Sequence, residues 1–256
     1  MFFFDLCYTT SERGTRILCR IPARLVHLKM LAVISDVHAN LEALEAVLAD
    51  AQGLDIICLG DLVDYGANPN EVVEIVRQRG IRTVMGNHDW AAASGDTSLF
   101  NARAAMSSIW TRAHLTNQNL EFVRTLSPEF RIPFEVAEAY FTHGSPDDRL
   151  WEYVDPRTHS DLFDHYLLRL GVSVIGLGHT HVPYVWREKG SVVFNPGSVG
   201  QPRDGDPRAS YATLSLEEQG VRVDIRRVQY DVQKAASKIR EAGLPESHAS
   251  RLLSGS

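Results

Sequence analysis

The sequence has no apolar stretch close to the roughly 20 residues that a membrane-spanning helix needs. Its short run of phenylalanines, residues 2–4, is followed directly by Asp5. This start lacks both the basic beginning and the longer apolar region of a signal peptide. We therefore expect no membrane partner.

Cysteine is also scarce. Cys7, Cys19 and Cys58 are odd in number and show no paired spacing, which argues against a disulfide framework. Cys58 lies in an apolar strand pattern, so we expect it in the core. The cytoplasm, where disulfides are rare, is the default compartment that this cysteine usage predicts.

Long basic runs interleaved with aromatic residues are absent as well, and the formal net charge is −6. Wrapping of a nucleic-acid backbone is therefore not the favoured function. A small anionic substrate remains compatible, because a local site can differ in sign from the whole protein. Hydrophobic residues make up 44% of the chain, which is ordinary for a globular protein. The sequence leaves the oligomeric state open.

The first 29 residues differ from the rest, with five Lys/Arg against two acids and no clear periodicity. We interpret residues 1–29 as a flexible tail or as upstream codons from a misassigned start; the alternative is an added strand or helix that packs on the domain. Met30 would begin a single domain over residues 30–244. Residues 245–256 would form a C-terminal tail.

From Met30 onward, apolar periodicity predicts alternating strands and helices. The predicted strands are 31–35, 55–59, 81–85, 130–136, 138–142, 172–177, 183–187, 191–194, 209–215 and 221–228. The predicted helices are 40–52, 69–79, 98–115, 118–126, 158–170 and 230–241. A βαβαβ start with a strand-rich end indicates an α/β fold with sheets inside and helices outside.

Polar residues follow five of these strands, at the point where each strand ends. The five motifs are Asp36-Val37-His38, Gly60-Asp61, Gly86-Asn87-His88-Asp89, His143-Gly144 and Gly178-His179-Thr180-His181. Ligands of α/β sheets bind beyond the carboxyl ends of strands, so these motifs can converge. Imidazoles with carboxylates suit zinc, manganese, iron or nickel. Each motif alone is weak, but the ordered set predicts one shared metal site.

These residues resemble the motifs of the calcineurin-like metallophosphoesterases, in the family's order, over about residues 31–200. The run Asn195-Pro196-Gly197-Ser198, followed by Gln201-Pro202-Arg203, is similar to the small bacterial phosphodiesterase branch. The resemblance implies a four-layer αββα sandwich, in which two mixed β-sheets lie face to face with helices outside. The predicted strands fit that fold.

The resemblance also implies two divalent metal ions and seven ligands. One metal would be bound by Asp36, His38 and His181, and the second by Asn87, His143 and His179. Asp61 would bridge both. Manganese is the favoured metal, with iron, zinc, nickel and magnesium as alternatives. Because ions about 3.5–4 Å apart can share a water and lower its pKa, we expect a bridging hydroxide as the nucleophile.

Two further residues would complete the catalytic set. His88 matches the family's histidine that faces the substrate without binding metal, and Asp64 matches the acid that pairs with it. We expect His88 to protonate the leaving alkoxide or bind the phosphate, with Asp64 orienting its ring. Asn87 would lie beside the substrate as well.

The chain departs from the protein-phosphatase pattern at two positions. Tyr65 stands where those enzymes carry an arginine that grips phosphate, and Asp89 stands where they carry a glutamate. Arg203 could replace the phosphate contact, or it could be a solvated charge or a partner of Asp204 or Asp206. Tyr65 could line the pocket or simply pack beside its neighbours.

The segment 91–129 is a candidate helical cap over the pocket, because Phe100, Trp110 and Phe122 lie in it and Trp90 precedes it. The alternative is that its aromatics pack on the sandwich. Trp151 is similarly ambiguous.

The leading hypothesis is a phosphodiesterase acting on small or nucleotide-like phosphorylated substrates. A phosphomonoesterase such as a nucleotidase is the alternative enzyme, and a non-catalytic metal-binding scaffold is the alternative from another class. Scaffold members of this fold commonly lack the equivalent of His88 or some ligands, and this chain has the full set.

Overall fold

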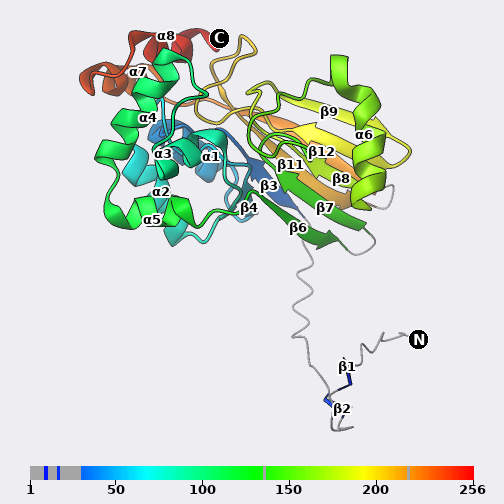
Figure 1. The fold of residues 1–256 in the computed structure, drawn as a ribbon. Helices are drawn as coiled ribbons and strands as arrows, with labels where there is room; N and C mark the ends of the chain where they lie inside the picture. Colours follow the sequence, from blue (N-terminus) through cyan, green and yellow to red (C-terminus); the bar gives the residue numbers. More distant parts are fainter. Residues whose placement is uncertain (1–8, 11–15, 18–29, 135–136, 218–219) are drawn as a thin grey trace.

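The fold places two five-stranded sheets face to face, with helices on both outer sides (Figure 1). The structure is a computed structural model that describes residues 9–10, 16–17, 30–134, 137–217 and 220–256. The predicted N-terminal tail, residues 1–29, lies outside these residues apart from two paired two-residue strands, β1 (Thr9–Thr10) and β2 (Arg16–Ile17).

The first sheet has the strand order β12-β11-β3-β4-β5. Its strands are β3 (Leu31–Ile34), β4 (Asp55–Cys58), β5 (Arg82–Thr83), β11 (Ala209–Glu217) and β12 (Gly220–Val228). The β3, β4 and β5 strands are parallel, whereas β11 runs antiparallel to both of its neighbours. Parallel strands point their carboxyl ends to the same edge, and three of the predicted site motifs follow these three strands.

The second sheet has the strand order β6-β7-β8-β10-β9 and is also mixed. Its strands are β6 (Glu129–Phe134), β7 (Ala137–Thr142), β8 (Val174–Gly176), β9 (Tyr184–Glu188) and β10 (Ser191–Asn195). The β7 and β8 strands are parallel, and the remaining two site motifs follow them.

Strand periodicity explains why both faces of each sheet are covered, since successive side chains point to opposite faces. In β3, Leu31 and Val33 lie in the core between the sheets, together with Phe141 and Phe194 of the second sheet. The alternate residues Ala32 and Ile34 belong instead to the core beneath the helices. The core therefore has three layers, and the predicted four-layer αββα sandwich is confirmed.

Eight helices occur among the described residues. They are α1 (Leu41–Asp50), α2 (Pro69–Gln78), α3 (Asn87–Ser94), α4 (Ala102–His114), α5 (Asn117–Arg124), α6 (Pro156–Leu170), α7 (Val232–Glu241) and α8 (Glu246–Ser254). Helix α6 covers the outer face of the second sheet, and the others gather on the side of the first sheet (Figure 1). None of them combines the length and hydrophobicity needed to cross a bilayer.

Two helices were not predicted from the sequence. Helix α3 begins inside the Gly86-Asn87-His88-Asp89 motif. The residues of this first turn are polar, so they show no apolar periodicity that would predict a helix. Helix α8 occupies the segment interpreted as a C-terminal tail, and that interpretation was wrong for residues 246–254. Its Ala249 and Leu252 are buried against α7, so this end of the chain is packed into the molecule.

Candidate metal centre

The loops that follow β3 and β4 are joined by backbone hydrogen bonds. Asp36 donates its N–H to the carbonyl of Gly60 at 2.9 Å, and His38 donates its N–H to the carbonyl of Asp61, also at 2.9 Å. The two strands are parallel neighbours, so their loops leave the same edge side by side. The first two predicted motifs are thus held together by main chain before any side chain is considered.

Left-handed backbone conformations are concentrated in the loops that carry the site motifs. Positive φ values between 48° and 70° occur in the loops after β3 and β4 and in the loop after β8, at the non-glycine residues Asp36, His38, Ala39, Asp61, Asp64, Tyr65, His179 and His181. Such a conformation costs about 1–2 kcal/mol per residue relative to ordinary backbone. It persists only where the surrounding structure over-determines it, which is typical of functional sites.

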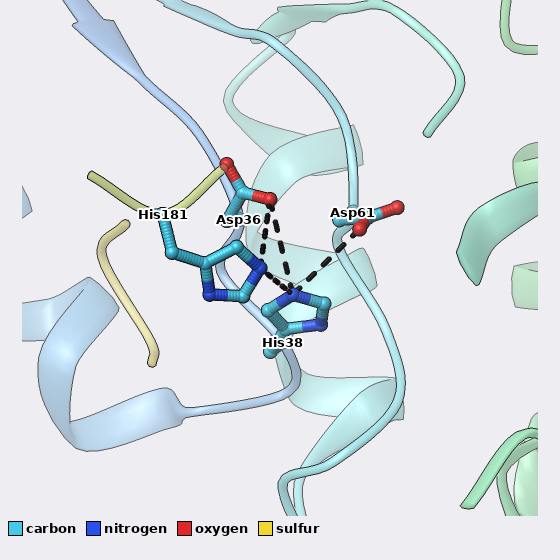
Figure 2. A group of neighbouring side chains, drawn as sticks. All are labelled: Asp36, His38, Asp61 and His181. Carbon is cyan, nitrogen blue, oxygen red and sulfur yellow. Dashed lines mark hydrogen bonds and ion pairs between the residues drawn. The ribbon is translucent and has the colours of Figure 1, made fainter. Parts of the chain in front are cut away.

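The first buried group of side chains comprises Asp36, His38, Asp61 and His181 (Figure 2). The Nε2 atom of His181 lies 3.2 Å from Oδ1 of Asp36 and 3.1 Å from Nε2 of His38. The same His38 nitrogen lies 3.6 Å from Oδ2 of Asp61. All four side chains are almost fully shielded from solvent, so their ligand atoms converge on one small volume.

The second buried group shares Asp61 with the first and adds His143 and His179. Nε2 of His143 lies 3.3 Å from Oδ2 of Asp61 and 3.1 Å from Nδ1 of His179. It also lies 3.1 Å from Oδ1 of Asn87, which brings that amide into the group. All seven predicted ligand residues are therefore brought together, in two groups that meet at Asp61.

Each of the four histidines contacts a backbone carbonyl with its outward nitrogen. The contacts are His38 Nδ1 to Val63 at 3.0 Å, His143 Nδ1 to Leu59 at 2.7 Å, His179 Nε2 to Trp151 at 3.2 Å and His181 Nδ1 to Gln201 at 2.6 Å. A carbonyl can only accept, so each outward nitrogen carries the proton. Such contacts fix the orientation of metal-binding histidines and leave the inward nitrogen as an acceptor.

The atoms that point into the cluster are hydrogen-bond acceptors, and the surrounding protein groups offer them too few donors. Such a set of atoms fits metal cations. Burial lowers the pKa of both His38 and His181, so both rings are neutral and their two inward nitrogens present lone pairs to each other at 3.1 Å. Oδ1 of Asp36 and Oδ2 of Asp61 are buried without a hydrogen-bond partner in the described part of the chain. Two buried His/Asp groups that share a carboxylate are the pattern of a binuclear metal site.

His88 lies beside this cluster without joining either group. Its Nδ1 is 2.8 Å from Oδ2 of the fully buried Asp64, as predicted for the pair. The His88 ring lies 5.0 Å from the ring of His38 and is stacked on Phe100 at 4.5 Å. Burial opposes protonation, but the Asp61 and Asp64 carboxylates outweigh it and raise the pKa of His88.

Asp89 has a structural function that the sequence did not reveal. Its carboxylate accepts the backbone N–H groups of Asp61 at 2.8 Å, Leu62 at 2.9 Å and Gly86 at 3.0 Å. It therefore ties the start of α3 to the loop that carries the shared ligand. Gly86 permits the approach, because a Cβ atom there would lie 2.0 Å from Oδ1 of Asp61.

Arg203 lies at the edge of the cluster and is not paired with the acids that follow it. Asp204 pairs with Arg227 and Asp206 pairs with Arg208, so the alternative that placed Arg203 with either acid was wrong. The Arg203 backbone N–H reaches the carbonyl of His181, and Nη2 donates to Oε1 of Gln201 at 3.1 Å. Its Nε is buried without a partner among the described residues.

Tyr65 packs against histidines on several sides. Its ring centroid lies 4.6 Å from that of His38, 4.5 Å from that of His88 and 4.6 Å from that of His248. The backbone N–H of Tyr65 donates to Oγ of Ser107, which lies on α4. Tyr65 is thus a buried wall of the site as well as a packing residue.

Aromatic rings form a rim beside His88 and His179. Trp151 lies 5.5 Å from Phe100 and 5.8 Å from Trp90, ring to ring, and the half-exposed Tyr153 lies 3.9 Å from the ring of His179.

The rest of the 91–129 segment serves the packing of the domain. Trp110 packs against the α7–α8 cluster, and Phe122 packs on the core beneath the helices. Both interpretations of this segment therefore hold for different residues: Phe100 borders the site, whereas Trp110 and Phe122 do not.

Residues 30–219 match the model of the calcineurin-like phosphoesterase superfamily domain, a stretch that contains every residue of the cluster. The chain belongs to the calcineurin-like phosphoesterase superfamily. An uncharacterized protein of Methanocaldococcus jannaschii is 38% identical over 246 residues, covering 88% of this chain and 98% of its own.

Solved structures of similar shape support the calcineurin-like fold. A metallophosphoesterase from Sphaerobacter thermophilus is 40% identical with a TM-score of 0.75, over 89% of this chain and 99% of that one. A hypothetical protein from Pyrococcus horikoshii is 19% identical with a TM-score of 0.80, over 89% and 98% of the two chains. At that identity the second likeness concerns the fold alone.

Proposed function

We propose that this metallophosphoesterase is a two-metal phosphodiesterase that acts on small or nucleotide-like diesters. Asp36, His38 and His181 would hold one divalent ion, and Asn87, His143 and His179 the other, with Asp61 shared. This division follows the two groups of converging acceptor atoms. Manganese is the favoured metal, although nitrogen and oxygen ligands of this kind accept several ions.

Ions bound there would stabilise negative charge on the phosphoryl oxygens and activate a water molecule for attack. The residues of the chain have separate tasks around that chemistry. Asp64 accepts from Nδ1 of His88 and keeps the ring oriented, so that Nε2 is free to give a proton to the leaving oxygen. The raised pKa of His88 keeps a larger fraction of it protonated at neutral pH.

Arg203 is proposed to contact a phosphoryl oxygen. Its guanidinium is close enough to contribute, after burial, to the lowered pKa of His181, and no acid neutralises it among the described residues. A planar guanidinium suits phosphate oxygens because it can donate two parallel hydrogen bonds. Tyr65 would complete this side of the pocket as an aromatic wall.

The observation that favours a diester is the aromatic rim. Phe100 and Trp151 lie on the His88 side, and Tyr153 lies over His179. Organic groups on both sides of a phosphodiester could pack on these rings, whereas a monoester would use only one side. Base and aryl groups gain from such stacking on aromatic side chains.

Hydrolysis of two chromogenic probes tests the proposal. We expect bis-p-nitrophenyl phosphate to be hydrolysed with a kcat/KM at least about ten-fold above that of p-nitrophenyl phosphate, in the presence of Mn²⁺, Ni²⁺, Zn²⁺ or Mg²⁺. Preference for the monoester would overturn the diesterase assignment in favour of a nucleotidase-like enzyme. Hydrolysis of neither probe with any of these ions would favour a non-catalytic scaffold.

A further inference from the structure

A second pocket lies on the far side of Tyr65 from the metal centre. Its volume is about 320 Å³, and it is lined by Tyr65, the first turn of α4 (residues 101–104), His248 and Arg251. The Tyr65 ring contacts His88 on one side and His248 on the other, at 4.5 and 4.6 Å between centroids. A single aromatic ring therefore separates this pocket from the proposed proton donor.

The pocket is basic although the chain as a whole is acidic. Arg103 and Arg251 line it, and no Asp or Glu does. Neither arginine forms an ion pair with a carboxylate within the described ranges, whereas most other arginines there do. Two unneutralised cations at one pocket repel each other, so the arrangement favours an anion between them.

A buried histidine also lines the pocket, and one of its ring nitrogens has no partner in the described structure. His248 is 1% exposed, and its Nδ1 has no hydrogen-bond partner in the described structure. Its Nε2 makes only a long contact, 3.4 Å, with the carbonyl of Arg103. Burial and, to a smaller extent, the charge of Arg251 lower the pKa of His248 to about 4, so the ring is neutral at pH 7 and the positive charge of the pocket comes from the two arginines alone.

The arginines, rather than the helix end, would supply the hydrogen bonds to a ligand. Oδ1 of Asn101 already accepts the backbone N–H groups of Arg103 and Ala104 in the first turn of α4. The guanidinium groups remain available, and their fork geometry matches phosphate oxygens.

We propose that this pocket binds a second phosphate group of the substrate, carried by the same molecule whose phosphodiester is cleaved at the metal centre. The inference rests on the proposed function and deepens it. The substrates of the enzyme would then be diesters that carry another phosphate a few bonds away, as in a nucleotide phosphorylated at two positions. Arg103 and Arg251 would determine this specificity without taking part in the reaction.

A pair of esters that differ only in this group tests the inference. Thymidine 5′-(p-nitrophenyl phosphate) has the scissile diester alone, and its 3′-phosphorylated derivative adds the second phosphate. We expect the 3′-phosphate to lower KM on the order of ten-fold in the metal-loaded protein. The Arg103→Met and Arg251→Met variants, singly and together, should lose this advantage while their kcat/KM for the plain ester stays the same.

The variants and controls keep folding separate from binding. Arg103 is exposed, so the Arg103→Met variant should fold normally. It therefore still tests the pocket if replacement of Arg251 disturbs α8. Arg226→Met, on β12, is the matched control, because Arg226 is exposed and pairs only loosely with Asp50 at 3.9 Å. If Arg226→Met loses the KM advantage of the 3′-phosphate to the same extent, the effect is due to net charge and the assignment is overturned. Equal KM values for both esters in the unchanged protein would also overturn it.

A binding measurement distinguishes failure of the pocket from failure of the proposed function. Calorimetric titration should show tighter binding of thymidine 3′,5′-bisphosphate than of thymidine 5′-monophosphate, and the arginine variants should abolish the difference. If neither ester is hydrolysed, the diesterase proposal fails while the titration still decides the pocket. If free inorganic phosphate gives the plain ester the same advantage, the pocket serves a free anion and the substrate assignment is overturned.

Discussion

At the residue scale, the atoms proposed to hold cations and the atom proposed to move a proton lie in different surroundings. The inward nitrogens of His38, His143 and His181 meet only acceptors or one another. His88 instead contacts a buried acid through Nδ1 and keeps its other nitrogen without a protein partner among the described residues. This difference in environment is what allows two kinds of histidine to stand within 5.0 Å of each other.

We expect His88→Ala to retain its metal and to lose turnover, by about 100- to 10,000-fold in kcat on an unactivated diester. The loss should shrink with a p-nitrophenolate leaving group, because that group leaves without a proton. Metal content by mass spectrometry and steady-state rates on both substrates provide the measurement. An unchanged kcat on the unactivated diester would refute the proton-donor role.

Asp89→Asn should weaken the site without removing a ligand. An amide NH₂ would face one of the three backbone N–H groups that the carboxylate accepts, at a cost of about 1–3 kcal/mol in unfolding free energy. Urea unfolding and metal titration would show the effect. Asp164→Asn, an exposed position on α6, is the control and should change neither quantity.

At the element scale, α1 and α7 are joined through one buried carboxylate. Glu42 pairs with Lys238 at 2.6 Å and with Lys234 at 3.2 Å, and its side chain is only 6% exposed. Burial opposes its ionisation, but the hydrogen bonds from Lys238 and Lys234 outweigh it and lower the pKa of Glu42. Stability from this carboxylate is therefore present above its ordinary pKa of 4.5 and is lost as the pH falls below that value.

We accordingly expect Glu42→Gln to lower the free energy of unfolding at pH 7 by about 1.5–3 kcal/mol, the range for a hydrogen bond to a charged group. The difference from the unchanged protein should narrow as the pH falls below about 4.5, where Glu42 itself becomes neutral. Denaturant unfolding at a series of pH values measures the difference in unfolding free energy between the two proteins. A difference that stays constant down to pH 3 would contradict the ion-pair explanation.

The elements that carry the site were largely predictable, and the reason is local. Asp36 follows β3 after one residue and His179 follows β8 after two, so the apolar strand and the candidate ligand are close together in the sequence. The contacts of Asp89 and the carbonyl of Trp151 were not predictable, because they depend on which loops meet in three dimensions. A backbone carbonyl has no sequence signature at all.

At the scale of the whole molecule, the C-terminal helices close the back of the site. Ala235 and Ile239 of α7 and Leu252 of α8 line a small cavity with His38 and Tyr65. The sequence interpretation that ended the domain at residue 244 missed this support, because a nine-residue helix at a chain end has too little apolar periodicity to be distinguished from a polar tail.

A chain ending at residue 244 should therefore lose several kcal/mol of stability and most of its activity, since Leu252 is buried and Tyr65 loses its contact with His248. Thermal melting and diester hydrolysis would measure both losses. Leu252→Ala should reproduce part of the destabilisation, by about 2–5 kcal/mol. Leu253→Ala is the matched control, since Leu253 is 39% exposed and should cost much less.

The inward-facing lone pairs of His38 and His181 also connect folding to metal supply. Only the folded chain assembles these acceptors, so bound ions shift the folding equilibrium by mass action, by about 2.7 kcal/mol per site at a free metal concentration of 100 times the dissociation constant. A chelator should lower the melting temperature, and excess Mn²⁺ should restore it. A melting temperature that changes with neither the chelator nor Mn²⁺ would contradict the binuclear site. In a cell, the quantity of folded protein would then follow the free concentration of divalent ions, and a low metal concentration would reduce the amount of folded protein.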